Sequence, residues 1–169
     1  VVRPPSVPNT LVTTNQAHTT VYNVPIGGRV SYRVTLRVPE GTTPAAVLTD
    51  VLDSGLALVS LDSLTASPAL SAGNGAFADV QPVNQGRRIR LDFGTLTNSD
   101  TDNATDETVT LDYTVVVLNS TGNNRGTGRN NAVSVAYTGG GITASAPNVT
   151  ILEPTLQVAC HPLDVRHAR

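Results

Sequence analysis

The segment RVSYRVTLRV, residues 29–38, alternates apolar and polar side chains without interruption. Successive side chains of a β-strand point to opposite faces, so a period of two predicts a strand with one buried and one solvated face. The side chains that we expect to face the core are Val30, Tyr32, Val34, Leu36 and Val38.

The same period recurs along the chain. RRIRLDFG, residues 87–94, repeats it with alternating charged and apolar residues. Residues 107–119 begin in the same way, but Val116 and Leu118 add apolar groups on the opposite face, which predicts that the end of this strand is covered on both sides. Further strands are expected at residues 11–24, 46–52, 56–65, 131–138 and 142–152.

Segments rich in glycine, proline and asparagine separate these strands, and no stretch shows the 3.6-residue apolar period of a helix. Pro147 cannot donate to a strand ladder, so it predicts an edge or a bulge within residues 142–152. Residues 67–86 are interpreted as a long loop or an irregular hairpin. This series of short strands and turns predicts an all-β fold, an antiparallel two-sheet β-sandwich.

The 169 residues are enough for one domain with a substantial core, and a second independent domain is not expected. Residues 1–10 are rich in proline and are interpreted as a linker or N-terminal arm, residues 11–153 as the sandwich, and residues 154–169 as a C-terminal tail. Order in either end segment would require something to pack against, such as a neighbouring copy.

The composition excludes several classes of function. A net charge of −2 and 4% aromatic residues argue against nucleic acid as a partner, and the longest apolar run is too short to insert into a membrane. Residues 1–5 contain no apolar signal-peptide core, so we expect any export signal to have been removed or to lie upstream. The single cysteine cannot form an intrachain disulfide, and all eleven basic residues are arginine, which excludes a lysine–asparagine or lysine–aspartate isopeptide bond.

Residues 26–60 resemble the start of the conserved-repeat, immunoglobulin-like domains of large bacterial and archaeal surface proteins. The matching residues are Ile26, Gly27, Tyr32, Val34, Asp50, Leu52, Gly55, Leu56, Val59 and Ser60. The segments LDFGTLTN (91–98), NNAVSVAYTGG (130–140) and APNVTILEPTLQV (146–158) resemble the closing strands, so the likeness covers residues 11–158. Asp53-Ser54 departs from the usual proline-containing turn. The resemblance implies an immunoglobulin-like β-sandwich that acts as a spacer or adhesive module, and not an enzyme.

An acidic cluster precedes the strand at residues 107–119. Asp100, Asp102, Asp106 and Glu107 are oxygen ligands of the kind that calcium takes, and Asp53 is expected at the same end of the sandwich as a further ligand, with Glu40 at the other end. The alternative is a solvated loop whose polar side chains bond their own backbone.

Two other sets of residues contain groups that could form a site. Cys160, His161, Asp164 and His167 have the chemistry of a zinc site, but a proline-containing tail is a poor context for one. The acidic cluster lacks the apolar surroundings that raise the pKa of a catalytic carboxyl group, so glycoside hydrolysis is not expected. The inward positions of Tyr32, Tyr113 and Tyr137 predict core or corner tyrosines.

The sequence therefore favours a non-enzymatic structural module of a secreted bacterial surface protein, located at the cell surface and stiffened by calcium if the acidic site is real. One alternative is a self-assembling extracellular filament subunit joined to neighbouring copies through its N- or C-terminal strand. The other is an adhesin tip that binds a glycan or a protein through the loops at residues 67–86 or 119–130.

Overall fold

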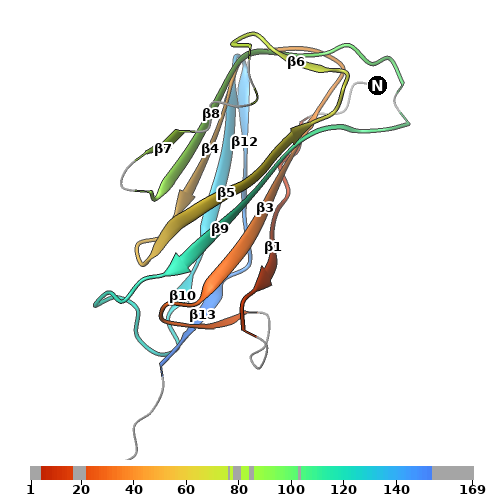
Figure 1. The fold of residues 1–169 in the computed structure, drawn as a ribbon. Coiled ribbons are helices and arrows are strands. Elements are labelled where there is room, and N and C mark those ends of the chain that lie inside the picture. The colour runs from red at the N-terminus through yellow and green to blue at the C-terminus, as the bar shows by residue number, and fades with distance from the viewer. Residues whose placement is uncertain are drawn as a thin grey trace, which may run out of the picture.

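The structure is a computed structural model, and it describes residues 5–16, 22–75, 77, 81–83, 86–102 and 104–153. All regular elements in these residues are strands, and they form two main sheets packed face to face (Figure 1). The predicted all-β, immunoglobulin-like antiparallel two-sheet β-sandwich is confirmed.

The first sheet has the strand order β1-β3-β9-β5. Its strands are β1 (Asn9–Thr14), β3 (Arg29–Val38), β9 (Glu107–Val117) and β5 (Leu56–Ala66). β3 and β9 pair without a register shift from Arg29 opposite Val116 to Val38 opposite Glu107. The segment that decided the fold prediction therefore lies in the middle of this sheet.

The second sheet has the order β12-β11-β4-β8-β6, with β7 also paired to β8. Its strands are β4 (Gly41–Leu52), β6 (Leu70–Ala72), β7 (Gln81–Val83), β8 (Arg88–Asn98), β11 (Asn131–Tyr137) and β12 (Gly140–Ser145). Residues 67–86, where the sequence predicts a long loop or an irregular hairpin, contain β6 and β7, and both run antiparallel to β8.

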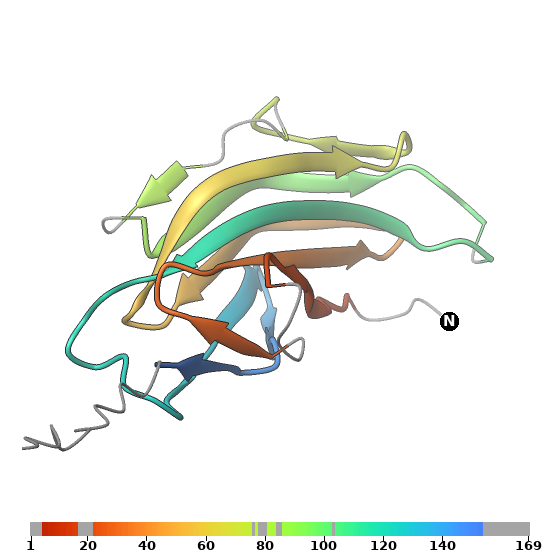
Figure 2. The same ribbon diagram turned by 60° about the horizontal axis from the view of Figure 1, so that its bottom comes forward.

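A third, small sheet was not predicted. It has the order β10-β13-β2 and consists of β10 (Gly128–Arg129), β13 (Val149–Leu152) and β2 (Asn23–Pro25). β13 runs parallel to β2, and Figure 2 shows the pair below the main sheets. The single strand predicted at residues 142–152 is thus two strands in different sheets, because the chain leaves the ladder around Pro147.

The core lies between the two main sheets and holds the inward side chains of both. All five apolar residues of β3 are at most 5% exposed, and Ile89, Leu91 and Phe93 of β8 are at most 2% exposed, as the alternation predicted. The prediction that both faces of the sheet are covered at the end of β9 is wrong for Leu118. This residue is 37% exposed because it lies one residue beyond the strand, in the following loop.

The chain enters and leaves the sandwich at opposite ends. We call the end where β3 stops and β9 starts the upper end, and the end where β4 stops and β11 starts the lower end, as they appear in Figure 1. Ser6 bridges to Arg37 at the upper end, whereas β13 leads the chain out at the lower end. No helix of the length and apolar character needed to span a bilayer occurs within the described residues.

Leu111 provides a test of the core. It lies on β9 and is 1% exposed, so we expect Leu111→Ala to lower the free energy of unfolding by about 2–5 kcal/mol. Its neighbour Thr110 faces the outer side of the sheet, so Thr110→Ala should change that free energy by less than about 0.5 kcal/mol. Urea unfolding measures both, and equal losses would contradict the assigned register.

Candidate functional site

The acidic cluster lies in the upper loop between β8 and β9, and its carboxylates have local partners. Asp100 accepts a hydrogen bond from the backbone N–H of Thr101 at 2.8 Å, and Asp102 accepts one from that of Ala104 at 2.9 Å. Such local bonds from side chain to backbone are expected if the segment is a solvated loop, which was the alternative to a calcium site.

The other two members of the cluster are held by neighbouring strands. Asp106 forms an ion pair with Arg37 of β3. Glu107, which is 9% exposed, accepts a hydrogen bond from the side-chain amide of Asn98 at 3.3 Å. The described residues contain no group of three or more His, Cys, Asp or Glu residues that could hold a metal ion.

The predicted position of Asp53 is wrong. Asp53 follows β4 at the lower end, where its carboxylate accepts a hydrogen bond from the backbone N–H of Asn130 at 2.8 Å, and Glu40 is at the upper end with the acidic loop. The cause is the segment before β8: β6 and β7 carry the chain back along β8 from the upper to the lower end. This additional crossing reverses the end at which every later loop lies.

The zinc hypothesis concerned Cys160, His161, Asp164 and His167. These four residues lie outside the described residues.

A different cluster of polar side chains lies in the centre of the sandwich. Asp50 of β4 is fully buried, and its carboxylate accepts hydrogen bonds from the hydroxyl of Tyr113 at 2.6 Å and from the side-chain amide of Asn131 at 3.2 and 3.3 Å. The amide of Asn131 also donates to the hydroxyl of Tyr113. Among the described residues, the hydrogen-bond partners of Asp50 are therefore neutral.

Burial determines the protonation of this cluster. Loss of hydration raises the pKa of Asp50 to about 6, although the hydrogen bonds from Tyr113 and Asn131 oppose the rise. Burial and the nearby charge of Asp50 also raise the pKa of Tyr113 well above its ordinary value. Tyr113 therefore stays a neutral hydrogen-bond donor across the physiological range.

The cluster connects the two main sheets. Tyr113 comes from the first sheet, whereas Asp50 and Asn131 come from the second. The side-chain oxygen of Asn131 accepts a further hydrogen bond at 3.2 Å from the amide of Asn9 on β1, so the edge strand of the first sheet is tied to the second sheet. We call these four residues the buried polar bridge.

Two buried polar atoms, one in the bridge and one beside it, have no hydrogen-bond partner among the described residues. They are the hydroxyl of Tyr32 and the side-chain oxygen of Asn9. The ring of Tyr32 stacks on that of Tyr113 with centroids 5.8 Å apart, and burial followed by the charge of Asp50 raises the pKa of Tyr32. The prediction of core tyrosines is thus confirmed for both rings, and the half-buried Tyr137 packs against the core.

The bridge was not predicted, although the sequence of β4 contains a signal for it. Asp50 occupies an inward position in β4, in phase with Leu48 and Leu52, which are at most 2% exposed. A carboxyl group in the apolar register of a strand requires buried donors from another element. The identities of Asn9 and Asn131 could not be inferred, since they come from distant parts of the sequence.

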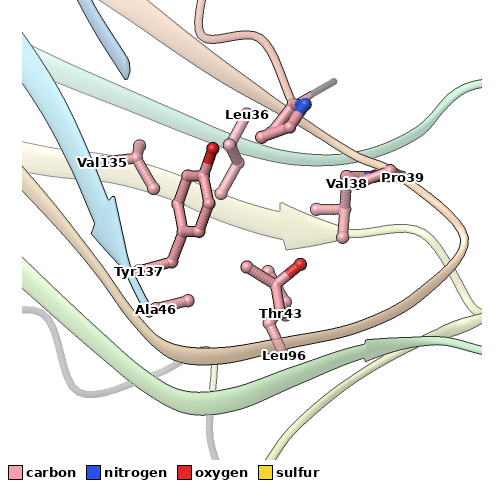
Figure 3. A pocket seen from close by; sticks show the side chains of 9 residues that line it. Leu36, Val38, Pro39, Thr43, Ala46, Leu96, Val135 and Tyr137 are labelled. Atoms are coloured by element: carbon pink, nitrogen blue, oxygen red, sulfur yellow. The ribbon is translucent and has the colours of Figure 1, made fainter. Parts of the chain in front are cut away.

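A small pocket lies near the upper end of the sandwich. It lies between the two sheets, and Figure 3 shows apolar side chains such as Leu36, Val135 and Leu96 around it. Its lining holds no acid or base other than the phenol of Tyr137. It therefore offers a place for an apolar side chain rather than for acid–base chemistry.

No protein-family model and no curated protein matches the sequence, so the predicted conserved-repeat family stays a prediction. Solved structures do match. The major pilin subunit BcpA of Bacillus cereus aligns with a TM-score of 0.52 and 14% identity over 89% of this chain. The 35 kDa C-terminal fragment of the major pilin GBS80 of Streptococcus agalactiae gives 0.54 and 9% over 88%.

The full-length pilus protein RrgB of Streptococcus pneumoniae gives a TM-score of 0.52 and 18% identity over 80% of this chain. This chain covers 40% of BcpA, 56% of the GBS80 fragment and 23% of RrgB, so it spans only part of each. At these identities the likeness is one of fold: the chain has the β-sandwich found in subunits of bacterial pili.

The raised pKa of Asp50 predicts an unusual pH dependence. Folded Asp50 takes up its proton near pH 6, whereas an unfolded aspartate does so near pH 4, so protonation stabilises the folded state between these values. We expect the free energy of unfolding to rise by up to about 3 kcal/mol as the pH falls from 7 to 4, and chemical denaturation across this range measures it.

Asp50→Asn should remove this slope. The control is Asp112→Asn, because the ion pair with Arg33 lowers the pKa of Asp112 and its contribution is lost only below about pH 4. A slope that persists in Asp50→Asn would show that another group causes it.

The calcium hypothesis stays a prediction, and thermal melting decides it. Since each acid of the upper loop has its own partner, we expect the same midpoint in millimolar calcium and in excess chelator. A midpoint raised by calcium, and lost in an Asp100→Asn, Asp102→Asn double variant, would instead establish a site.

Proposed function

We propose that this chain is a non-enzymatic, load-bearing module of an extracellular bacterial surface filament. The observation that carries the proposal is the position of the chain ends. The described chain begins at Pro5 near the upper end and finishes at Glu153 below the lower end, so the main strands run along the line that joins the two (Figure 1). Copies or repeats joined through these ends would form a linear string.

This arrangement suits a module under tension. Force applied at residue 5 pulls β1 upward along β3. Force applied at residue 153 pulls β13, and with it the rest of the sandwich, downward. The hydrogen bonds between β1 and β3 are then loaded together in shear, whereas peeling would break them one at a time. The buried polar bridge adds a further attachment, because the amide of Asn9 is bonded to Asn131 in the opposite sheet.

The fold shared with subunits of bacterial pili supports the same function. Within the described residues, the buried acid of the bridge is inaccessible to a substrate, since Asp50 and Asn131 are at most 1% exposed. We place the protein at the cell surface, with neighbouring copies or repeats of itself as partners.

Single-molecule stretching tests the proposal. We expect a higher unfolding force when the protein is pulled at residues 5 and 153 than when it is pulled at residues 5 and 104. The second pair lies entirely at the upper end, so it peels β1 from β3 instead of shearing the ladder. Equal forces in the two geometries would contradict a role in bearing load along the chain.

Electron microscopy separates a subunit from a spacer. Regular fibres formed by the purified chain alone indicate a self-assembling subunit, whereas dispersed particles indicate a spacer that depends on a longer chain for its place in the filament. A glycan array tests the adhesin-tip alternative.

A further inference from the structure

β1 and the residues before it form an edge segment that lies on the surface of the sandwich. β1 occupies one end of the first sheet, where it pairs with β3. A register shift interrupts it between Leu11 and Thr13, and Val12 is 49% exposed. An edge segment of this kind can leave its place without any other strand being unthreaded, and it leaves behind a row of unpaired backbone groups.

Residues 5–14 carry a specific pattern toward the interior. Val7 is 4% exposed and belongs to the core, Asn9 is 6% exposed, and Leu11 packs against the core from a half-buried position. The segment thus presents one polar group between two apolar ones. Two apolar side chains alone would allow the segment to pair with β3 in several registers. The polar side chain between them favours one of these registers.

The place that this segment fills is complementary to the pattern. The edge of β3 supplies backbone bonds, with the N–H groups of Thr35 and Arg37 donating to the carbonyls of Pro8 at 3.0 Å and Ser6 at 2.8 Å. Pro5 is one of the residues that line the apolar pocket. We call this place the β1 groove.

At the centre of the β1 groove, the side-chain oxygen of Asn131 accepts the hydrogen bond from Asn9 at 3.2 Å. Asp50 fixes the orientation of that amide. Since the carboxylate accepts hydrogen bonds from the nitrogen of Asn131, the oxygen of Asn131 must face β1.

We propose that the β1 groove is an interaction surface between copies of this chain, in which residues 5–14 of one copy replace the same residues of the next. This inference rests on the proposed filament function and identifies the contact that would join its subunits. The occupant is a second copy because residues 5–14 match the groove in the structure. The exchange of this segment between two copies re-forms every bond that it breaks.

Asn9 sets the register of the exchanged segment. A shift of two residues would bring Val7 or Leu11 against Asn131 and leave a buried amide unpaired, which weakens binding about five- to hundredfold. A shift of one residue would turn the inward face of the segment outward.

Cysteine trapping tests the exchange. Thr10 and Arg33 are partners across β1 and β3, and both are exposed. Partners of this kind have Cα atoms about 5.5 Å apart, which suits a disulfide. Thr10→Cys and Arg33→Cys are made in separate chains, each with Cys160→Ala, and the two proteins are mixed at high concentration and oxidised. A disulfide between residue 10 of one protein and residue 33 of the other is favoured when β1 of one copy lies on β3 of the other.

The matched control replaces Arg33→Cys by Arg88→Cys, because Arg88 is an exposed arginine on β8 of the second sheet. We expect the mixed dimer on a non-reducing gel to be at least about tenfold more abundant with residue 33 than with residue 88. Equal yields from residues 33 and 88 would overturn the proposal.

The stretching experiment is independent of this result. If the trap fails while the force difference between the two pulling geometries holds, the load-bearing function stands and the exchange between copies is wrong. If the force difference is absent, the proposed function itself fails, whatever the gel shows.

Discussion

A carboxyl group placed in an apolar interior must be surrounded by hydrogen-bond donors, and in this protein the donors come from both sheets. Asp50 is held by Tyr113 across the core and by Asn131 beside it. The same Asn131 reaches Asn9 on the edge strand, so one buried acid fixes the spacing of the sheets and the position of β1. Asn98 of β8 forms a second polar link to the first sheet, through Val38 and Glu107. The contacts among the apolar core residues are non-directional, and they would tolerate small shifts that these networks do not.

The layered architecture was predictable because it depends on a repeated local signal. Strand after strand alternates apolar and polar residues, and the residues expected inward in β3 and β8 are buried. The end of the sandwich at which each loop lies was less predictable, since it depends on how many times the chain has already crossed from one end to the other. Two strands of three residues each, β6 and β7, carry too few residues to show a period, and overlooking them placed Asp53 at the wrong end.

The candidate site illustrates a different limit. An acid in the inward register of β4 is visible in the sequence, but its partners lie 63 and 81 residues further along the chain. Propensity and spacing contain no information on contacts at such separations. The conspicuous acidic loop was easier to notice, although in the structure its carboxylates bond to their own turns and to adjacent strands.

The chain contains no lysine, so a lysine isopeptide bond cannot attach β1 to the second sheet, and the hydrogen bond between Asn9 and Asn131 does so instead. A covalent tie would survive any stretch until the polymer itself broke. A hydrogen-bonded tie gives way first, lengthens the module and dissipates the work done on it. Because breaking this tie changes no covalent bond, it re-forms when tension falls, so a string of such modules would recoil after overload without permanent damage.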